Sequence, residues 1–190
     1  MRTMLLLAGG LGVAVALAGC TSGPSGPAKP ARLSPAIGAN PLDMSKAAAR
    51  PCTMLRPDQL AQFHLTSPGT TTSIASGPAC AWTPTVSGLP SYLAGVDLHS
   101  GGLEALYHRR ASLPVFQPTK VSEYPAVHTA TTTSALHHGQ CTTQVGVAND
   151  TLLIVSVTVP SSQPLDYTDP CPSADDLAAA ILANTEGAAP

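Results

Sequence analysis

The chain has 190 residues, of which 11% are charged and 4% aromatic, and its formal net charge is −2. This length fits one domain once flanking segments are set aside, and the weakly acidic balance excludes a nucleic-acid-binding protein, which would need a basic surface. The few charges and abundant small residues favour an exported chain with long loops over a helical cytosolic enzyme.

Residues 1–19 predict a secretory signal peptide that is cleaved from the mature protein. Arg2 supplies a positive charge, and the apolar run over 4–18 is shorter than a bilayer span of about 20 residues. The sequence Leu-Ala-Gly-Cys at 17–20 resembles the bacterial lipobox. That resemblance implies that Cys20 becomes the N-terminus and carries a diacylglyceryl group with acyl chains such as palmitate, which anchors the protein to the extracytoplasmic face of the cell membrane. An ordinary secreted protein is the alternative.

Residues 20–50 predict a lipidated cysteine followed by a disordered tether, because they are rich in Pro, Ala, Ser and Gly and show no apolar period. Between residues 21 and 50, four basic residues face Asp43 alone, whereas from residue 51 onward four basic residues face ten acidic ones. A basic tether is favourable beside an anionic membrane, by about 1 kcal/mol per charge. The three alanines at 47–49 can form a short local helix.

Residues 51–185 predict a single globular domain, and 186–190 a disordered tail. Pro57 suits the first turn of a short helix that buries Leu60 and Phe63. The next expected elements are an edge strand over 70–75, a hairpin of strands over 79–83 and 92–98, and a helix over 103–110 with apolar residues on one side.

The second half of the domain predicts four strands and a terminal helix. The strands are expected over 115–121, 124–130, 140–147 and 152–159. The last of these is apolar on both faces at first and on one face later, which is typical of a central strand. Ser173 followed by Asp176 marks a helix start close to a capping box. The predicted fold class is α+β, a single antiparallel sheet with N-terminal, middle and C-terminal helices mainly on one face.

Four cysteines remain once Cys20 carries lipid, and an even number in an exported domain predicts disulfides. Three connectivities are open; we favour Cys52 with Cys80 and Cys141 with Cys171, because each pair ties the loose start of a helix to a strand. A metal site at His137, His138 and Cys141 is a weaker alternative, since no second ligand pair with matching spacing occurs. We therefore expect neither a metal nor a cofactor.

No catalytic motif is present in the expected domain, so we predict no catalytic residue. The six histidines lie mostly in or beside expected loops, and they are His64, His99, His108, His128, His137 and His138. Contacts between these histidines and the carboxylates of Asp97, Glu104 or Glu123 are an open alternative, but solvated histidines without a catalytic role are the simpler interpretation. Trp82 shares a strand face with Cys80, which favours core packing against a disulfide over a ligand-stacking platform.

Several short motifs follow one another between residues 51 and 182. They are Pro51-Cys52 before a Leu-bearing helix, Cys80-Ala81-Trp82, a helix over 102–107, Tyr124-Pro125-Ala126-Val127, Cys141 with 145–147, and Asp169-Pro170-Cys171 before an Ala-rich helix. Their order, together with the lipobox, resembles a family of actinobacterial lipoproteins of unknown function that includes mycobacterial Lpr-type lipoproteins. The resemblance implies a lipid-anchored, exported α+β domain with paired cysteines, and no established activity. His64 stands where the family often has glycine after the first helix.

These features lead us to expect a lipid-anchored module of the cell envelope that binds an unidentified ligand or protein. A secreted hydrolase with an unrecognised site and a purely structural envelope protein are the alternatives. A partly apolar pocket with convergent polar groups would favour binding, whereas a nucleophile and base in contact within a cleft would favour the enzyme.

Overall fold

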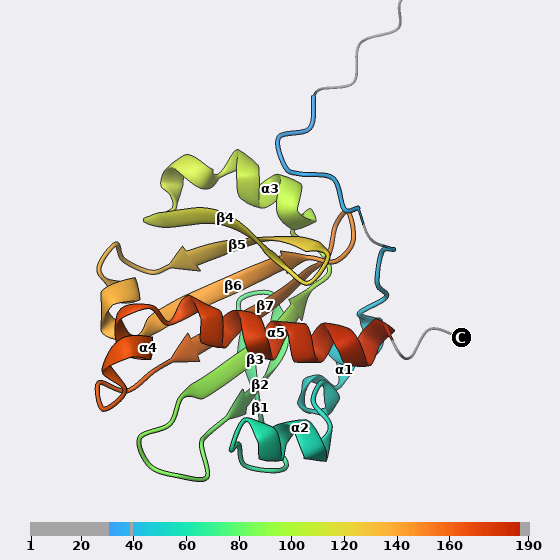
Figure 1. Cartoon of the computed structure of the whole chain (residues 1–190). Helices are drawn as coiled ribbons and strands as arrows, with labels where there is room; N and C mark the ends of the chain where they lie inside the picture. Colours follow the sequence, from blue (N-terminus) through green and yellow to red (C-terminus); the bar gives the residue numbers. More distant parts are fainter. Residues whose placement is uncertain (1–30, 39, 187–190) are drawn as a thin grey trace, which may run out of the picture. The chain divides into compact units, whose positions relative to one another are not determined.

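A computed structural model describes residues 31–38 and 40–186, which are built on one seven-stranded antiparallel sheet (Figure 1). The strand order is β1-β2-β3-β7-β6-β5-β4, and every neighbouring pair is antiparallel. The strands are β1 (Thr70–Ile74), β2 (Gly77–Trp82), β3 (Ser91–Asp97), β4 (Val115–Val121), β5 (Tyr124–Ala130), β6 (Gln140–Gly146) and β7 (Leu152–Thr158). The predicted α+β class with a single antiparallel sheet is confirmed.

The burial patterns of β7 and β1 fit their positions in the sheet. In β7, Leu152 and Leu153 are both buried, and from Ile154 onward buried and partly exposed residues alternate. This pattern fits its place as the fourth strand of seven, as the sequence predicted. At the edge, β1 has four exposed residues and one half-buried residue, as expected for a strand without a partner on one side.

One face of the sheet carries most of the core and most of the helices. α5 (Cys171–Glu186) crosses this face in Figure 1 and buries Leu177, Ile181 and Leu182, each at most 1% exposed. α2 (Pro57–Gln62) lies beside α5, where Nε2 of Gln59 donates a hydrogen bond to the carbonyl of Ala180 at 3.1 Å. The longest helix and the central strands therefore form one continuous hydrophobic core.

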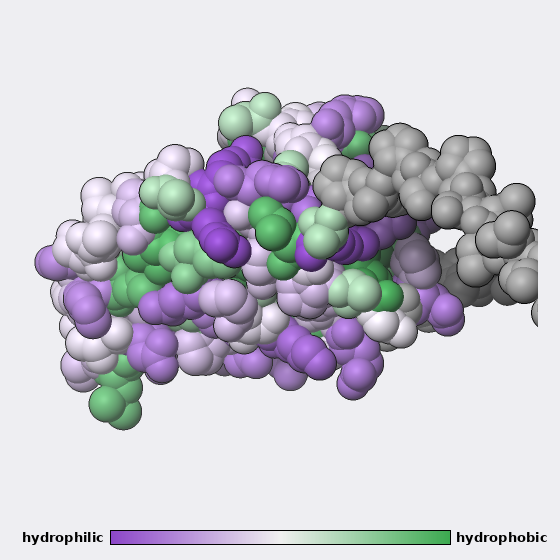
Figure 2. All heavy atoms as spheres, turned by 90° about the horizontal axis from the view of Figure 1, so that it is seen from above, coloured by the Kyte–Doolittle hydropathy of each residue, from purple (hydrophilic) through white to green (hydrophobic). Residues whose placement is uncertain are grey.

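α3 (Gly102–His108) covers part of the opposite face, and 3-10 turn η2 (Arg110–Ser112) follows it. Leu103 and Leu106 of α3 pack in a second buried cluster with Val127 of β5 and Leu152 of β7. Figure 2 views the molecule from the side of α3 and shows separate hydrophobic areas between hydrophilic side chains. The rest of this face presents partly exposed hydroxyl side chains, such as Thr142 and Ser156.

The N-terminal segment packs against the domain much earlier than the sequence predicted. Residues 32–50, here called the strap, were expected to belong to a disordered tether, but Met44 is 1% exposed. The amide of Leu42 donates to the carbonyl of Val147 at 3.0 Å, and the hydroxyl of Tyr124 donates to the carbonyl of Asn40 at 2.9 Å. The packed domain therefore begins near residue 32 rather than at 51. The strap ends in α1 (Ser45–Ala49), where the alanines predicted a local helix.

Glu104 of α3 holds the beginning of the strap. Its carboxylate accepts hydrogen bonds from the amide of Leu33 at 2.9 Å and from the amide and hydroxyl of Ser34, both at 2.8 Å. These donors, the amides first, lower the pKa of Glu104 to about 2. Arg32 adds a guanidinium nitrogen 3.7 Å from the same carboxylate. The strap is therefore attached at α3 before it reaches the other face of the sheet.

Some shorter elements differ from the sequence prediction. α5 starts at Cys171 rather than at Ser173, because Pro172 suits the first turn of a helix. α4 (Pro164–Thr168), 3-10 turn η1 (Pro51–Thr53) and 3-10 turn η3 (Ala135–His138) were not predicted. His64 has φ 54°, in the left-handed region that favours glycine, and it follows Phe63, the residue after the end of α2. Within the described ranges, no helix has the length and hydropathy of a bilayer-spanning segment.

Candidate functional site

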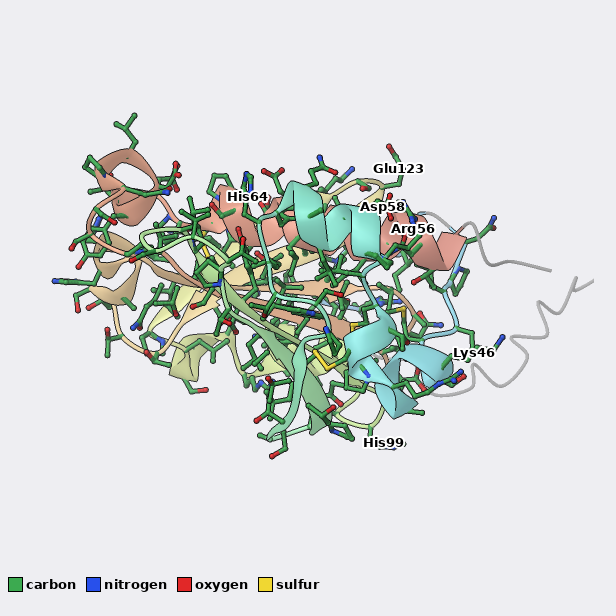
Figure 3. All side chains as sticks on the ribbon, turned by 90° about the horizontal axis from the view of Figure 1, so that it is seen from below. Lys46, Arg56, Asp58, His64, His99 and Glu123 are labelled. Atoms are coloured by element: carbon green, nitrogen blue, oxygen red, sulfur yellow. A yellow bond between two sulfur atoms is a disulfide. The ribbon has the colours of Figure 1, made fainter. Side chains whose placement is uncertain are left out.

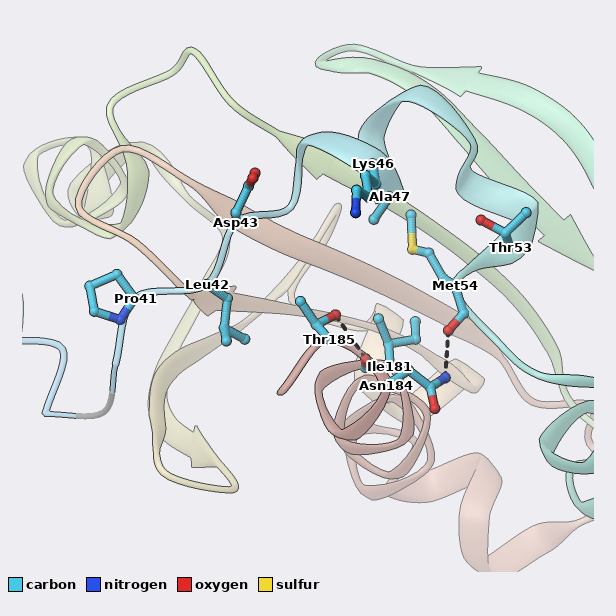
Figure 4. A pocket seen from close by; sticks show the side chains of 10 residues that line it. All are labelled: Pro41, Leu42, Asp43, Lys46, Ala47, Thr53, Met54, Ile181, Asn184 and Thr185. Atoms are coloured by element: carbon cyan, nitrogen blue, oxygen red, sulfur yellow. Dashed lines mark hydrogen bonds between the residues drawn. The ribbon is translucent and has the colours of Figure 1, made fainter. Parts of the chain in front are cut away.

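A groove of about 450 Å³ lies between the strap and the C-terminal part of α5 (Figure 4). Its volume falls within the range of small-molecule sites. The strap, the segment after α1 and the last turns of α5 all contribute to it. The lining residues are Pro41, Leu42, Asp43, Lys46, Ala47, Thr53, Met54, Ile181, Asn184 and Thr185.

The groove has apolar walls because three separate elements each turn an apolar residue toward it. Leu42 comes from the strap, Met54 follows η1, and Ile181 belongs to the buried stripe of α5. Figure 4 shows these side chains on opposite sides of the same space, with Ala47 of α1 beside them. Because Ala47 is small, the wall formed by α1 leaves room for an apolar part of a ligand.

The rim of the groove carries one cation. The amide of Ser45 donates to Oδ1 of Asp43 at 2.9 Å, and this hydrogen bond lowers the pKa of the Asp43 carboxyl. Lys46 is exposed (Figure 3), and none of the ion pairs found in the described part of the chain includes it. The carboxylate of Asp43 is thus held by the start of α1 and also attracts the charge of Lys46, whose ammonium group remains a cation at the rim of the groove.

The inner polar residues of the groove are already bonded within the protein. Nδ2 of Asn184 donates to the carbonyl of Met54 at 2.7 Å and to Oε1 of Gln59 at 2.6 Å, and its Oδ1 accepts from Arg56. The hydroxyl of Thr185 donates to the carbonyl of Ile181 at 3.2 Å. The bonds of Asn184 fix α5 against the segment after α1, whereas the Thr185 bond lies within α5. A ligand would therefore find apolar contacts inside the groove and its main charged contact at Lys46.

A second polar cluster lies where β5, β6 and α5 meet. Both carboxylate oxygens of Asp175 lie near Nε2 of His128, at 2.9 and 3.0 Å. The hydroxyl of Thr143 donates to Oδ1 of Asp175 at 2.6 Å. Strand register explains the contact, because His128 and Thr143 are paired on β5 and β6, and Asp175 lies in the first turns of α5.

This cluster lacks the order of a nucleophilic triad. In such a triad the histidine accepts the proton of the nucleophile and the carboxylate orients the histidine. Here the Thr143 hydroxyl donates to the carboxylate rather than to His128, and Thr143 is fully buried. The cluster therefore links α5 to the sheet through hydrogen bonds, and its threonine is not placed to attack a substrate.

The structure confirms both predicted disulfides. Cys52 is bonded to Cys80 and Cys141 to Cys171. The first joins η1 to β2, and the second joins β6 to the start of α5. Cys20, the predicted lipidation site, lies outside the described residues. Trp82 is fully buried, which agrees with a core position rather than a ligand platform.

The other histidines are exposed and distributed over the surface. His64 and His99 project from different parts of the molecule in Figure 3. His108 approaches Glu104 at 3.2 Å, one of the meetings that the sequence left open. His137 and His138 lie in η3, and a ring nitrogen of His138 lies 2.8 Å from the carbonyl of Ser134. The alternative metal set of His137, His138 and Cys141 is not brought together.

The grouping that the sequence missed contains His128 with Cys141 and Cys171. One ligand atom from each lies within 4.8 Å of the other two. The sequence contains no direct signal for this group. His128 comes close to the segment that carries Cys141 only because residues 126–129 pair with residues 142–145 in the sheet. The spacing of these residues in the sequence does not show which residues of the two strands are paired.

Comparison with known proteins gives one finding. A family model described as "Protein of unknown function (DUF3558)" matches residues 15–184. No curated protein and no solved structure matches the chain. The family match covers nearly the whole sequence, from before the lipobox-like residues 17–20 to the last turn of α5. The chain therefore belongs to the DUF3558 family of proteins of unknown function.

Proposed function

We propose that this protein is a lipid-anchored protein of the cell envelope whose folded domain binds a small amphipathic ligand. The anchor rests on the signal-like residues 1–19 and on Cys20 at the end of the lipobox-like sequence. The match to the family begins at residue 15 and so includes that sequence. The resemblance to actinobacterial lipoproteins supports the same location, on the extracytoplasmic face of the membrane.

The single observation that carries the binding function is the groove between the strap and α5. It combines apolar walls at Leu42, Met54 and Ile181 with the ammonium group of Lys46 at its rim. A ligand that matches both features has an apolar chain and a carboxylate or another single anionic group. Burial of the chain would provide about 0.8 kcal/mol for each methylene group removed from water. The charge would add up to about 1 kcal/mol, because Lys46 is exposed.

A fluorescent fatty acid tests this proposal directly. The probe is undecanoic acid with a dansyl group at its far end, and its methyl ester is the uncharged counterpart. Lys46→Gln should weaken binding of the acid by up to about fivefold and leave binding of the ester unchanged. Lys120→Gln, which changes an exposed lysine on β4, is the matched control and should affect neither probe.

A second pair of variants tests the walls of the groove. Ala47→Phe places a ring in the groove and should weaken both probes by at least tenfold. Ala49→Phe changes an exposed alanine of the same helix that does not line the groove, and should have no effect. If the wild-type protein binds neither probe, or if both phenylalanine variants behave alike, the groove is not the binding site. Native mass spectrometry of protein taken from its own envelope would then identify the true ligand class.

The anchor has a separate test. Cys20→Ala should abolish incorporation of a palmitate analogue during growth and leave the chain unprocessed or released to the medium, because the acyl chains provide the membrane affinity. A wild-type protein without label would overturn the anchor and leave the groove proposal intact. The hydrolase alternative also has a test. It predicts a hydrolytic activity that is lost in a folded His128→Ala variant, because His128 contacts Asp175.

A further inference from the structure

The cluster beneath the start of α5 contains more than a disulfide. Sγ of Cys141, Sγ of Cys171 and one ring nitrogen of His128 all lie within 4.8 Å of one another. They come from β6, α5 and β5, and the two cysteines are only 2% and 5% exposed. In the oxidised protein the sulfur atoms are bonded to each other and cannot bind a metal.

We propose that reduction of the Cys141–Cys171 disulfide creates a zinc site. A phosphine reductant and one water molecule break the S–S bond: the phosphine is oxidised by two electrons and takes the oxygen of the water as a phosphine oxide, and the two hydrogens of the water end on the two sulfur atoms as thiols. Zn²⁺ then binds both thiolates and the imidazole of His128, and the two thiol protons leave to solvent. Water occupies the fourth position of the tetrahedron.

The ligand atoms are already close to one another. Zinc binds sulfur at about 2.3 Å and imidazole nitrogen at about 2.0–2.1 Å, so tetrahedral ligand atoms lie roughly 3.5–4 Å apart. The three ligand atoms are confined within 4.8 Å of one another, and zinc binding would bring them to the tetrahedral separations once the S–S bond is broken. The ligand set of two thiolates and one imidazole is typical of zinc.

Asp175 provides the support that a zinc-binding histidine usually has. Metal-bound histidines commonly use their second nitrogen to contact a carboxylate, which fixes the orientation of the ring. Both oxygens of Asp175 lie within 3.0 Å of Nε2 of His128, and Thr143 holds the carboxylate from the other side. Because Asp175 holds Nε2, the proposal assigns the zinc to Nδ1 of His128.

The second disulfide is an internal control. Cys52 and Cys80 have nearly the same loop length as Cys141 and Cys171, at sequence separations of 28 and 30. Among the residues that the structure describes, however, the only group of three possible metal ligands is that of His128, Cys141 and Cys171. Zinc should therefore distinguish the two cysteine pairs once both are reduced.

The experiment uses the full mature chain in a phosphine reductant, with zinc chloride as the probe. We expect one zinc ion per chain, measured by competition with a chromophoric chelator. Alkylation with iodoacetamide followed by peptide mass spectrometry should show that zinc protects Cys141 and Cys171 but leaves Cys52 and Cys80 reactive. A variant with Cys52→Ser and Cys80→Ser should keep the site, and one with Cys141→Ser and Cys171→Ser should lose it.

Variants of the histidine and its carboxylate partner complete the test. His128→Ala should lower zinc affinity by more than a hundredfold, and Asp175→Asn by about tenfold, the effect of losing an outer-shell partner. If the serine variants do not fold, protection mapping of the reduced wild-type chain decides alone. Equal protection of all four cysteines, no protection, or unchanged affinity in His128→Ala would overturn the proposal.

Discussion

Gly69 occupies a position where even a methyl group should not fit. A Cβ atom added there would lie 2.4 Å from Nε1 of Trp82 and 2.5 Å from Sγ of Cys80. Both neighbours are fully buried, and the sulfur is bonded to Cys52, so neither can move away easily. Backbone strain is not involved, because the φ angle of Gly69 lies outside the left-handed region.

Gly69→Ala should therefore destabilise the folded domain by about 3 kcal/mol. Adding a methylene to a packed core usually costs about 1–3 kcal/mol, and two immobile neighbours favour the upper end of that range. The matched control is Gly38→Ala, where the added atom meets nothing within 4 Å. That change should be neutral, or stabilise by up to about 1 kcal/mol by restricting the unfolded chain.

Urea unfolding measures both variants, and Trp82 provides the signal because it is the only tryptophan in the chain. The urea concentration at the unfolding midpoint should be lower for Gly69→Ala than for the wild type, and the slope of the free energy of unfolding against urea should be unchanged. The fluorescence emission of native Gly69→Ala should also differ from that of the wild type, because the indole of Trp82 is displaced. The reasoning fails if Gly69→Ala and Gly38→Ala differ by less than about 0.5 kcal/mol. The space beside the indole would then be larger than the distances indicate.

Three further predictions concern stability. Replacing Cys141 and Cys171 together by serine should cost about 4 kcal/mol in oxidising conditions, given their sequence separation of 30, as measured by urea unfolding. His64→Gly should stabilise by up to about 1 kcal/mol, measured by thermal unfolding, because glycine tolerates φ 54°. The pKa of Glu104 is lowered from 4.5 to about 2. The hydrogen bonds from the strap to its carboxylate should therefore stabilise the strap fully above pH 4.5, and this stabilisation should be lost as the pH falls through 2. Hydrogen exchange of the strap amides should show this loss, and Glu104→Gln should remove its pH dependence.

The sheet was predictable because its signals are local. β4 and β5 have the expected bounds on either side of Ser122 and Glu123, and the turn between them places Ser122 at φ 51°. The run that forms β7 is apolar on both faces at its start, which identified the central strand. Each of these features requires only neighbours within one strand or turn, so a single sequence contains them.

The strap could not be predicted in the same way. Its buried residues in the described range, Ser34 and Met44, lie ten positions apart with mostly exposed residues between them. No helical or strand period connects them, so a segment rich in proline and alanine gives the same pattern whether it packs or not. The partner groups, including the carboxylate of Glu104 and the carbonyl of Val147, lie 70 residues or more away in sequence.

The His128 cluster was missed for a related reason. His137 and His138 are close to Cys141 in sequence, which made them the natural candidates for a metal site. In the folded chain these two histidines lie in η3 and are exposed, whereas strand pairing brings β5, which carries His128, alongside β6, which carries Cys141. The three residues of this site come from two paired strands and from the C-terminal helix. They are far apart in sequence, so no short motif contains them.

The strap connects the two parts of the proposed function. It forms one wall of the groove through Leu42 and Ala47, and it leads back toward Cys20. Because Glu104 contacts the strap from Arg32 onward, residues 21–31 separate a lipidated Cys20 from the folded domain. Fully extended, these residues span at most about 40 Å. A lipid anchor at Cys20 would thus hold the first residues of the strap within that distance of the membrane surface.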